Sequence, residues 1–286
     1  MSTMFRLYWC LLAFLVFNAC SDSKPHQQKE VPNYSNWTTL TKGMEYREMT
    51  APVQSFIGDS KLSILRFNPS EFHFDLLAAS QHDSLPRTVV KWAQSFDLMV
   101  AFNAGMYEQA KPLQSRAYLQ NGKHYNNPKL LEAFNLMLAL GPKKGLNRSN
   151  IEVLDLSCSD WRQEKHCFKG FAQGLRMLDC NGKPTYWQKK IQSCSMLVAA
   201  EDNQGWFYLI FTRSPYTHNQ MIDFMKQMPR GLHDAIYLEG GPEASLYIHV
   251  NEHHIKKVGS WVSDTWETDD NKHFWPLPNI IGIRKK

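Results

Sequence analysis

The stretch of residues 206–241 reads WFYLIFTRSPYTHNQMIDFMKQMPRGLHDAIYLEGG. Its opening run, residues 206–212, is the clearest core strand of the chain, because it is rich in aromatic and branched apolar side chains. A helical pattern follows, and residues 235–238 form a second short apolar run. Strand–helix–strand units commonly place their two strands parallel within one sheet, so this stretch predicts one parallel pair.

The helix within this stretch has a defined start and one apolar face. Thr217 is a suitable N-cap, and Gln220 stands three residues later, which is the spacing of a capping box. Four apolar side chains then recur at helical intervals, namely Met221, Phe224, Met225 and Met228. We interpret the methionines as core residues and not as a ligand surface. The helix is expected to end at residues 229–231, which read Pro-Arg-Gly.

Outward from this unit, the chain consists mostly of short strand-like segments. Residues 61–68 largely alternate in polarity, and residues 72–78 follow after an Asn-Pro turn, which predicts a hairpin. Residues 246–250 and 254–258 predict a second hairpin, and residues 88–95 predict a short helix. Further strands are expected at 98–102, 134–140, 196–200 and 279–284. The predicted fold class is therefore α+β, a single strand-rich domain with a mixed sheet and a few packed helices.

The N-terminus has the pattern of an export signal. Arg6 precedes an apolar run over residues 7–17, which is shorter than the ~20 residues that a membrane-spanning helix needs. Residues 17–20 read Phe-Asn-Ala-Cys and resemble the motif that directs diacylation of a cysteine, here Cys20. An ordinary cleavable signal is the alternative.

This processing would divide the chain into three parts. We expect a signal peptide over residues 1–19, a polar lipid-anchored tether over residues 20–30 and one globular domain over residues 31–286. Ser21 and Asp22 favour an outer-membrane address. The chain is thus expected to be an envelope lipoprotein on the periplasmic face of the outer membrane, attached to the membrane through its lipid.

Four of the six cysteines remain when the signal and the lipidation candidate are set aside, namely Cys158, Cys167, Cys180 and Cys194. An even number in an exported chain predicts two disulfides. Three pairings are possible, and the pairing local in sequence is Cys158–Cys167 with Cys180–Cys194. A zinc site is the alternative, but these spacings lack the close C-x-x-C pairs of structural zinc sites.

The charge of the chain is mild and mixed in sign. Its formal net charge is +5, from 32 basic and 27 acidic residues. This permits an anionic ligand, but it does not indicate nucleic-acid binding, which usually needs a clustered basic face.

Two loops combine glycines with side chains suited to catalysis. Residues 103–107 read Asn-Ala-Gly-Met-Tyr, and residues 238–242 read Leu-Glu-Gly-Gly-Pro. Glycine lets a backbone approach a ligand closely, and its N–H group can face phosphate oxygens. A carboxylate in such a loop can act as a general acid or base, or hold a sugar hydroxyl or a metal. Taken alone, each loop is more simply an ordinary turn.

Several short motifs occur in an order that resembles the phosphodiester glycosidase family. The likeness covers residues 62–283, and the shared order is more specific than any single motif. The motifs are Asn103-Ala104-Gly105-Met106-Tyr107, Pro112-Leu113, Asn121-Gly122-Lys123, Phe134-Asn135-Leu136, Gly141-Pro142, Gly145, Ala172-Gln173-Gly174, Asn181-Gly182-Lys183, Phe211-Thr212-Arg213-Ser214, Leu238-Glu239-Gly240-Gly241 and Pro278-Asn279.

The resemblance implies hydrolysis of a sugar–phosphate diester at the anomeric carbon, in envelope or extracellular glycans. Under this hypothesis Glu239 is the acid/base or ring-orienting carboxylate. Asn103 would hydrogen-bond a sugar hydroxyl or a phosphate oxygen, and the main chain at Gly105, Gly240 and Gly241 would bind substrate. A second carboxyl group is expected in an ordinary glycosidase but is not assigned.

Three further residues are candidates for the phosphate side of such a site. Arg213 would pair with phosphate, and a surface ion pair is its alternative role. Thr217 and His218 lie at a predicted helix N-terminus, where an anion is favoured. His218 would protonate a leaving group, or else be a solvated residue at the start of the helix.

Two departures from the family pattern support a second hypothesis. The family usually has aspartate where Glu239 stands, and often has an arginine close to residues 191–194, which here read Ile-Gln-Ser-Cys. The alternative is a non-catalytic glycan-binding or envelope-assembly lipoprotein with the same fold. No cofactor is expected, although a divalent cation is compatible with the site.

Two other clusters have simple explanations. His249 and residues 252–254, which read Glu-His-His, are interpreted as a hairpin tip and not as a metal site. Trp261, Trp266 and Trp275 are able to stack on sugar rings, but packing explains them equally well.

Overall fold

The computed structural model describes residues 36–108, 110–188 and 192–286. All described residues belong to one compact unit. The predicted signal peptide, Cys20 and the tether lie outside the described residues. Within the described ranges, no helix has the length and apolar character needed to cross a membrane.

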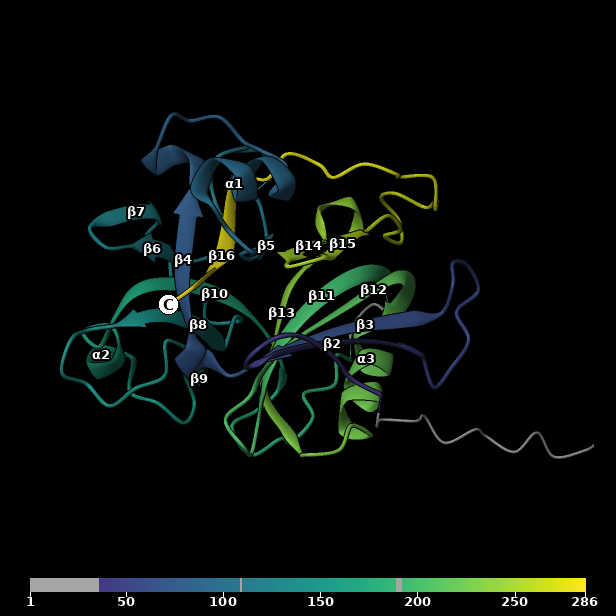
Figure 1. Ribbon diagram of the computed structural model, residues 1–286, viewed down its shortest axis with the longest axis horizontal. Helices are drawn as coiled ribbons and strands as arrows, with labels where there is room; N and C mark the ends of the chain where they lie inside the picture. The colour runs from purple at the N-terminus through teal and green to yellow at the C-terminus, as the bar shows by residue number, and fades with distance from the viewer. Residues whose placement is uncertain (1–35, 109, 189–191) are drawn as a thin grey trace, which may run out of the picture. The chain divides into compact units, whose positions relative to one another are not determined.

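The described strands form two sheets that share one apolar core (Figure 1). The larger sheet has eleven strands. Its path runs through β1 (Thr38–Thr41), β2 (Met44–Thr50), β3 (Lys61–Phe67), β12 (Phe207–Thr217), β11 (Ser193–Asp202), β13 (Leu232–Gly240), β10 (Phe168–Leu178), β6 (Leu119–Asn121) and β7 (His124–Asn127), with β8 (Leu136–Pro142) paired to β10 and β9 (Ile151–Asp155) paired to β8.

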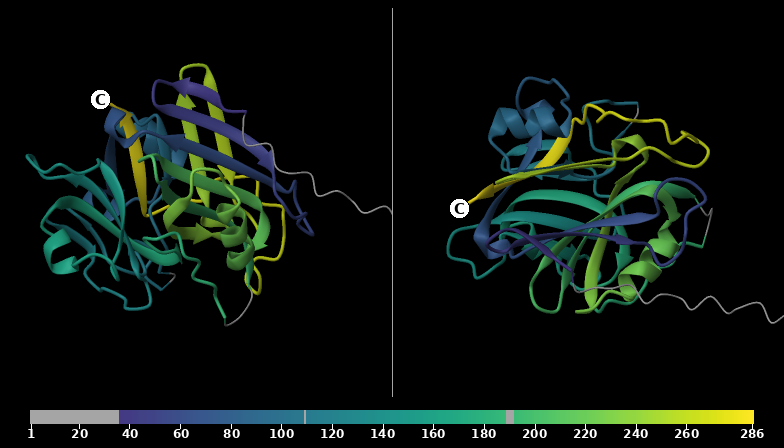
Figure 2. Two further views of the ribbon diagram at one scale, coloured as in Figure 1. Left: turned by 90° about the horizontal axis from the view of Figure 1, so that it is seen from below. Right: turned by 45° about the vertical axis from the view of Figure 1, so that its right-hand side comes forward.

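The smaller sheet has five strands. Their order is β15 (His253–Val258), β14 (Ser245–Val250), β5 (Val100–Asn103), β16 (Asn279–Lys285) and β4 (Phe72–Ala78). The two views in Figure 2 show this sheet lying across the larger one.

Short helices cover the outer faces of the sheets. They are α1 (Val89–Phe96) on the smaller sheet, α3 (His218–Lys226) on the larger sheet and the single-turn α2 (Trp161–Glu164) beside β8 and β10, together with the 3₁₀ helices η1 (Pro69–Glu71), η2 (Ala79–Gln81) and η3 (Gly241–Glu243). The predicted capping box of α3 is confirmed, because Thr217 and Gln220 exchange both of its hydrogen bonds. The predicted apolar stripe of this helix is buried.

Alternate residues of the central strands face two different apolar clusters. In β12, Phe211 packs in the core between the sheets, whereas Ile210 packs under α3. In β16, Ile281 faces the same central core and Ile280 packs under α1. Both faces of these strands are therefore buried, which explains why their sequences are apolar throughout instead of alternating.

The predicted mixed sheet and parallel pair are wrong. Every pairing between the described strands is antiparallel. β11 and β12 pair with each other, so β11 already occupies the position beside β12 when the chain leaves α3, and β13 joins the far side of β11. The domain is strand-rich as predicted, but it is predominantly β and not a clear α+β fold.

One of the two predicted hairpins is also wrong. β3 and β4 belong to different sheets and are joined by η1. The Asn68 side chain accepts a hydrogen bond from the Ser70 N–H, so the Asn-Pro sequence starts a 3₁₀ turn that carries the chain across the core. The hairpin of β14 and β15 is confirmed.

The predicted disulfides need correction. Cys158 is bonded to Cys180, with their Cα atoms 6.6 Å apart, and Cys167 and Cys194 are free thiols. Cys167 lies at the end of α2, where its thiol faces the Gln163 carbonyl. Cys194 is buried in β11. The bond thus joins the loop after β9 to the loop after β10, a proximity that depends on sheet order and not on spacing in the sequence.

Candidate active site

The two glycine loops identified in the sequence meet at one carboxyl group. β5 ends at Asn103, and the chain then turns so that the N–H of Tyr107 donates to Oε2 of Glu239 over 3.0 Å. β13 ends at Gly240, whose N–H donates to Oε1 of the same side chain over 2.9 Å. Both oxygens of Glu239 therefore accept main-chain hydrogen bonds, one from each loop.

The surroundings of Glu239 raise its pKa to about 8. Burial makes the largest contribution, because it disfavours the charged form, and the neighbouring Glu243 carboxylate adds to it. The two N–H donors and the cation Arg116 act in the opposite direction. The residue as a whole is half-buried. A carboxyl group with a pKa of about 8 is mostly protonated at neutral pH.

Glu243 is a second carboxyl group beside the first, and the sequence did not assign it. It ends η3, the 3₁₀ turn that starts at Gly241, and burial raises its pKa as well. The Gly-Gly-Pro sequence is the signal that a turn follows Glu239. The sequence does not show where the Glu243 carboxyl group lies after that turn, because its position depends on the 3₁₀ geometry of η3.

Arg116 is the other residue near Glu239 that the sequence did not reveal. Its N–H donates to the Met106 carbonyl over 2.9 Å, which ties it to the loop after Asn103. No motif marked this residue, because its position depends on how the irregular segment between β5 and β6 folds back.

The Asn103 side chain is fully buried and links β5 to β14. Its Oδ1 accepts a hydrogen bond from the Ser245 N–H over 3.0 Å, two residues after Glu243. Its Nδ2 has no partner among the described residues. Asn103 therefore lies beside the segment that carries Glu243, and its visible contact fixes that segment.

The glycines of the site differ in how strictly they are required. A Cβ on Gly240 would lie 2.4 Å from Oη of Tyr237 and 2.8 Å from Sγ of Cys194. Gly241 has φ of +66°, which disfavours any side chain. A Cβ on Gly105, in contrast, would meet only the Gln173 carbonyl at an ordinary 3.6 Å. Close packing thus explains why a side chain is excluded at Gly240, and backbone conformation explains why one is disfavoured at Gly241.

His218 is packed against two aromatic side chains. Its ring stacks on Trp187 at a centroid distance of 3.6 Å and meets the Tyr237 ring edge-on at 4.6 Å. Burial lowers its pKa to about 4, so the ring is neutral at neutral pH. The Thr217 hydroxyl accepts the Gln220 N–H as a helix cap. Both residues have local structural contacts, and the prediction of a solvated His218 is wrong, because the residue is 7% exposed.

Arg213 is engaged by groups other than the carboxyl pair. Its guanidinium forms an ion pair with Asp269 over 2.8 Å and donates to the carbonyls of Val258 and Asp269 over 2.9 Å. The charged groups that act on Glu239 are Glu243 and Arg116. Of the two roles considered for Arg213, phosphate binding and an ion pair, the structure shows the ion pair.

The described residues bring three metal-ligand side chains together at one place. These are Asp155, Cys158 and Cys180, and both sulfurs are committed to the disulfide. The His249 and His254 rings pack against each other on the β14–β15 hairpin, 4.9 Å apart.

The tryptophans that were considered for sugar stacking pack against other rings. Trp261 meets the Phe56 ring edge-on at 5.1 Å, and Trp266 meets Trp275 at 5.3 Å.

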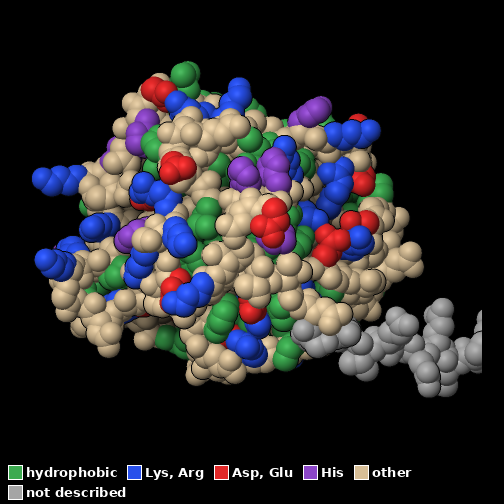
Figure 3. Space-filling view, viewed as in Figure 1, with side chains coloured by type: hydrophobic (Ala, Val, Ile, Leu, Met, Phe, Trp, Pro, Cys, Tyr) green, Lys and Arg blue, Asp and Glu red, His purple; other side chains and the backbone are tan. Residues whose placement is uncertain are grey.

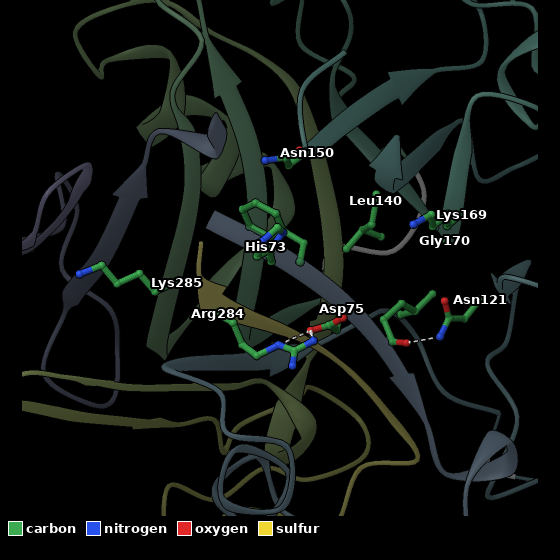
Figure 4. Close-up of a pocket in the computed structure, with 12 residues that line it drawn as sticks. His73, Asp75, Asn121, Leu140, Asn150, Lys169, Gly170, Arg284 and Lys285 are labelled. Carbon is green, nitrogen blue, oxygen red and sulfur yellow. Dashed lines mark hydrogen bonds and ion pairs between the residues drawn. The ribbon is translucent and has the colours of Figure 1, made fainter. Parts of the chain in front are cut away.

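A cavity of about 470 Å³ opens between the smaller sheet and the β8–β10 region, and Figure 4 shows its lining. An ion pair between Arg284 and Asp75 lies on its wall, and Lys169 and Lys285 are exposed at its rim. Neither glycine loop contributes to its lining. The cavity is thus separate from the carboxyl pair.

Two solved structures share this fold. The catalytic domain of zebrafish N-acetylglucosamine-1-phosphodiester alpha-N-acetylglucosaminidase, auto-inhibited by its pro-peptide, aligns with a TM-score of 0.56 at 12% identity and covers 89% of this chain and 88% of that one. A hypothetical protein from Synechocystis aligns with a TM-score of 0.55 at 10% identity and covers 87% of this chain and 63% of that one. At these identities the likeness shows the fold alone. Comparison with curated proteins gives no match.

The family comparison agrees with the resemblance that the motifs indicated. The model of the phosphodiester glycosidase family matches residues 96–284, a range that includes both glycine loops and the Glu239–Glu243 pair. The chain therefore belongs to the phosphodiester glycosidase family.

Proposed function

We propose that this protein hydrolyses glycosyl phosphodiester bonds in envelope or extracellular glycans, with Glu239 as its proton donor. The observation that carries the proposal is the environment of Glu239, whose carboxyl group joins both glycine loops while its pKa is held near 8. General acids work best when their pKa lies near the working pH. A glutamate with an ordinary pKa of 4.5 would have lost its proton at neutral pH.

The carboxyl pair divides the chemistry of the reaction. Water attacks the anomeric carbon, and the bond from that carbon to the phosphate oxygen breaks. Glu239 gives its proton to the departing phosphate, and Glu243 in its carboxylate form accepts a proton from the attacking water. Arg116 attracts the anionic phosphate. Asn103 is a positioning residue in this scheme, because it fixes the main chain at Ser245 beside Glu243.

The test is release of free sugar from an N-acetylglucosamine 1-phosphodiester by the purified protein. We expect Glu239→Gln to lower kcat by about 10² to 10⁴, the usual contribution of a general acid or base. The matched control is Glu252→Gln, at a hairpin tip where the side chain is 82% exposed. Wild-type activity in Glu239→Gln would remove Glu239 from the mechanism.

A non-catalytic glycan-binding or envelope-assembly role is the second candidate, and one observation favours it. The N–H groups of Tyr107 and Gly240 are both engaged by Glu239, and Arg213 is engaged by Asp269. Fewer donors are then free to bind a phosphate group. Binding of the same diester by the wild-type protein without sugar release would establish this role and exclude the hydrolase.

We further propose that the chain is an outer-membrane lipoprotein anchored through Cys20. The proposal depends on the sequence of residues 1–22, which lie outside the described residues. Metabolic labelling with a radioactive fatty acid tests it. Label should enter the wild-type protein and not Cys20→Ala, and equal labelling of the two would exclude Cys20 as the anchor.

A further inference from the structure

A second cavity, about 300 Å³ in volume, lies where β15 and the segment after it face β3 and β12. Five basic side chains line it, namely Lys61, Arg213, Lys256, Lys257 and Lys272. Figure 3 shows lysine and arginine side chains gathered among acidic ones on the face where β15 and β3 lie. None of the proposed catalytic groups belongs to this lining.

The basic side chains of this cavity outnumber the carboxylates near it. Glu48 pairs with both Lys61 and Lys257, and Asp269 pairs with Arg213. Asp59 is the one acidic residue in the lining itself. The ammonium groups of Lys256 and Lys272 have no hydrogen-bond or ion-pair partner among the described residues. Five cationic groups against three carboxylates leave two positive charges in excess, which favours an anionic ligand.

The wall of the cavity is held in place by buried contacts. The Arg213 guanidinium is fixed between two carbonyls and Asp269, as described above. Asn271 is 8% exposed, and its Nδ2 donates to the Gly259 carbonyl over 2.7 Å. The position of Lys272 is thereby set by its buried neighbour. A cationic cavity with a fixed wall binds an anion at a lower entropic cost than mobile surface lysines would.

This cavity adjoins the glycine loop of the carboxyl pair. Val258, whose carbonyl accepts a hydrogen bond from Arg213, is followed by Gly259. Gly259 packs so closely on the loop that a Cβ there would lie 2.1 Å from the Gly241 carbonyl oxygen. The wall of the basic cavity is thus continuous with the segment that packs on the glycine loop.

We propose that the basic cavity is a subsite for a second phosphate group of a glycan chain whose cleaved phosphodiester lies at Glu239. This inference rests on the proposed function. The volume suits a phosphate with part of a sugar, and the concave shape favours a glycan over the flat surface of a membrane. The protein would thus act on glycans that carry repeated phosphates and bind them more tightly than molecules with one phosphate.

The test measures binding in the Glu239→Gln background, so that hydrolysis does not interfere. The probes are an oligomer of N-acetylglucosamine 1-phosphate, the methyl diester of the monomer and a neutral chitin oligosaccharide. The variant is Lys256→Gln with Lys272→Gln, which removes two unpaired charges. We expect it to weaken binding of the oligomer about tenfold at low salt, to lose most of that effect in 0.5 M salt and to leave binding of the methyl diester unchanged.

A matched control separates this site from general charge effects. Lys169→Gln with Lys285→Gln removes the same charge at the cavity of Figure 4, where both lysines also lack a partner among the described residues. It should change affinity for the oligomer less than twofold.

Several outcomes would overturn the subsite. One is an equal loss of affinity for the oligomer in the two double variants, and another is no loss of affinity in Lys256→Gln with Lys272→Gln. A third is failure of the oligomer to bind the protein at all. The last is that Lys256→Gln with Lys272→Gln weakens binding to phosphatidylglycerol vesicles but does not weaken binding to the glycan. Failure of the proposed function is recorded separately, as absence of sugar release by the wild-type protein.

Discussion

The N–H of Tyr107 lies 3.0 Å from Oε2 of Glu239, and 132 positions in the sequence separate the two residues. This bond joins the loop that leaves the smaller sheet at β5 to the loop that ends β13 in the larger sheet. The carboxyl group of Glu239 is thus held at a junction between the two sheets.

The pH dependence of activity should report the protonation of Glu239. With a pKa of about 8, the acid form is present at neutral pH and is lost above pH 8, so kcat/KM should fall on the alkaline side. Replacing Glu243 by Gln removes the charge that helps to raise this pKa, and the alkaline limb should move to lower pH. Glu243→Gln also lacks the proposed base, so its activity should fall, and the pH profile of its residual sugar release is compared with that of wild type. An alkaline limb that stays in place in Glu243→Gln would show that the two carboxyl groups are not coupled.

Stability should also depend on the protonation of Glu239. A raised pKa in the folded state means that the folded protein holds this proton more tightly than the unfolded chain does, where the pKa is near 4.5. The stabilisation is therefore complete below pH 4.5 and is lost as the pH rises to about 8. Glu239→Gln does not titrate, so its stability relative to wild type should improve with pH, by roughly 1 kcal/mol per pH unit across this range.

Urea unfolding of both proteins at pH 5, 7 and 9 measures this difference. Parallel stability curves for the two proteins would contradict a raised pKa at Glu239.

The tight packing behind the glycine loop predicts a large difference between two alanine variants. Gly240→Ala places a methyl group against Tyr237, Cys194 and a main-chain carbonyl, and should cost about 1–3 kcal/mol of unfolding free energy. Gly105→Ala meets one atom at van der Waals distance and should cost less than 1 kcal/mol. Thermal unfolding of the two variants measures this difference. Similar losses of unfolding free energy in both would mean that the packing at Gly240 relaxes easily.

The disulfide should stabilise the domain through the unfolded chain. Cys158 and Cys180 are 22 positions apart, and closing a loop of this size is worth about 3 kcal/mol. The double substitution of both cysteines by serine should therefore lower the midpoint of urea unfolding clearly. Cys167→Ser, which leaves the disulfide intact, is the control and should change it little. Equal effects of the two changes would indicate that the loop is already constrained without the bond.

Local patterns in the sequence predicted the local structure well. The capping box at Thr217, the apolar face of α3 and the β14–β15 hairpin all depend on residues close together in the chain, and all are confirmed. The family was recognised from the order of many short motifs, and the match over residues 96–284 confirms it.

Errors arose where distant segments decide the structure. Nothing near Cys158 indicates that Cys180 lies beside it, because the neighbourhood follows from β8 pairing with both β9 and β10. The sequence indicated Glu239 through its neighbouring glycines. It did not reveal Arg116, which acts on the same carboxyl group from a segment without regular secondary structure.

The position of β16 has a consequence for how the domain assembles. Asn279–Lys285 lies between β5 and β4, so the smaller sheet has a gap in its middle until this segment arrives. Among the described strands, β4 is hydrogen-bonded only to β16. A nascent chain that ends before Asn279 therefore cannot complete its core, and a tag or truncation that disturbs residues 279–285 would act on the centre of a sheet instead of on a loose end.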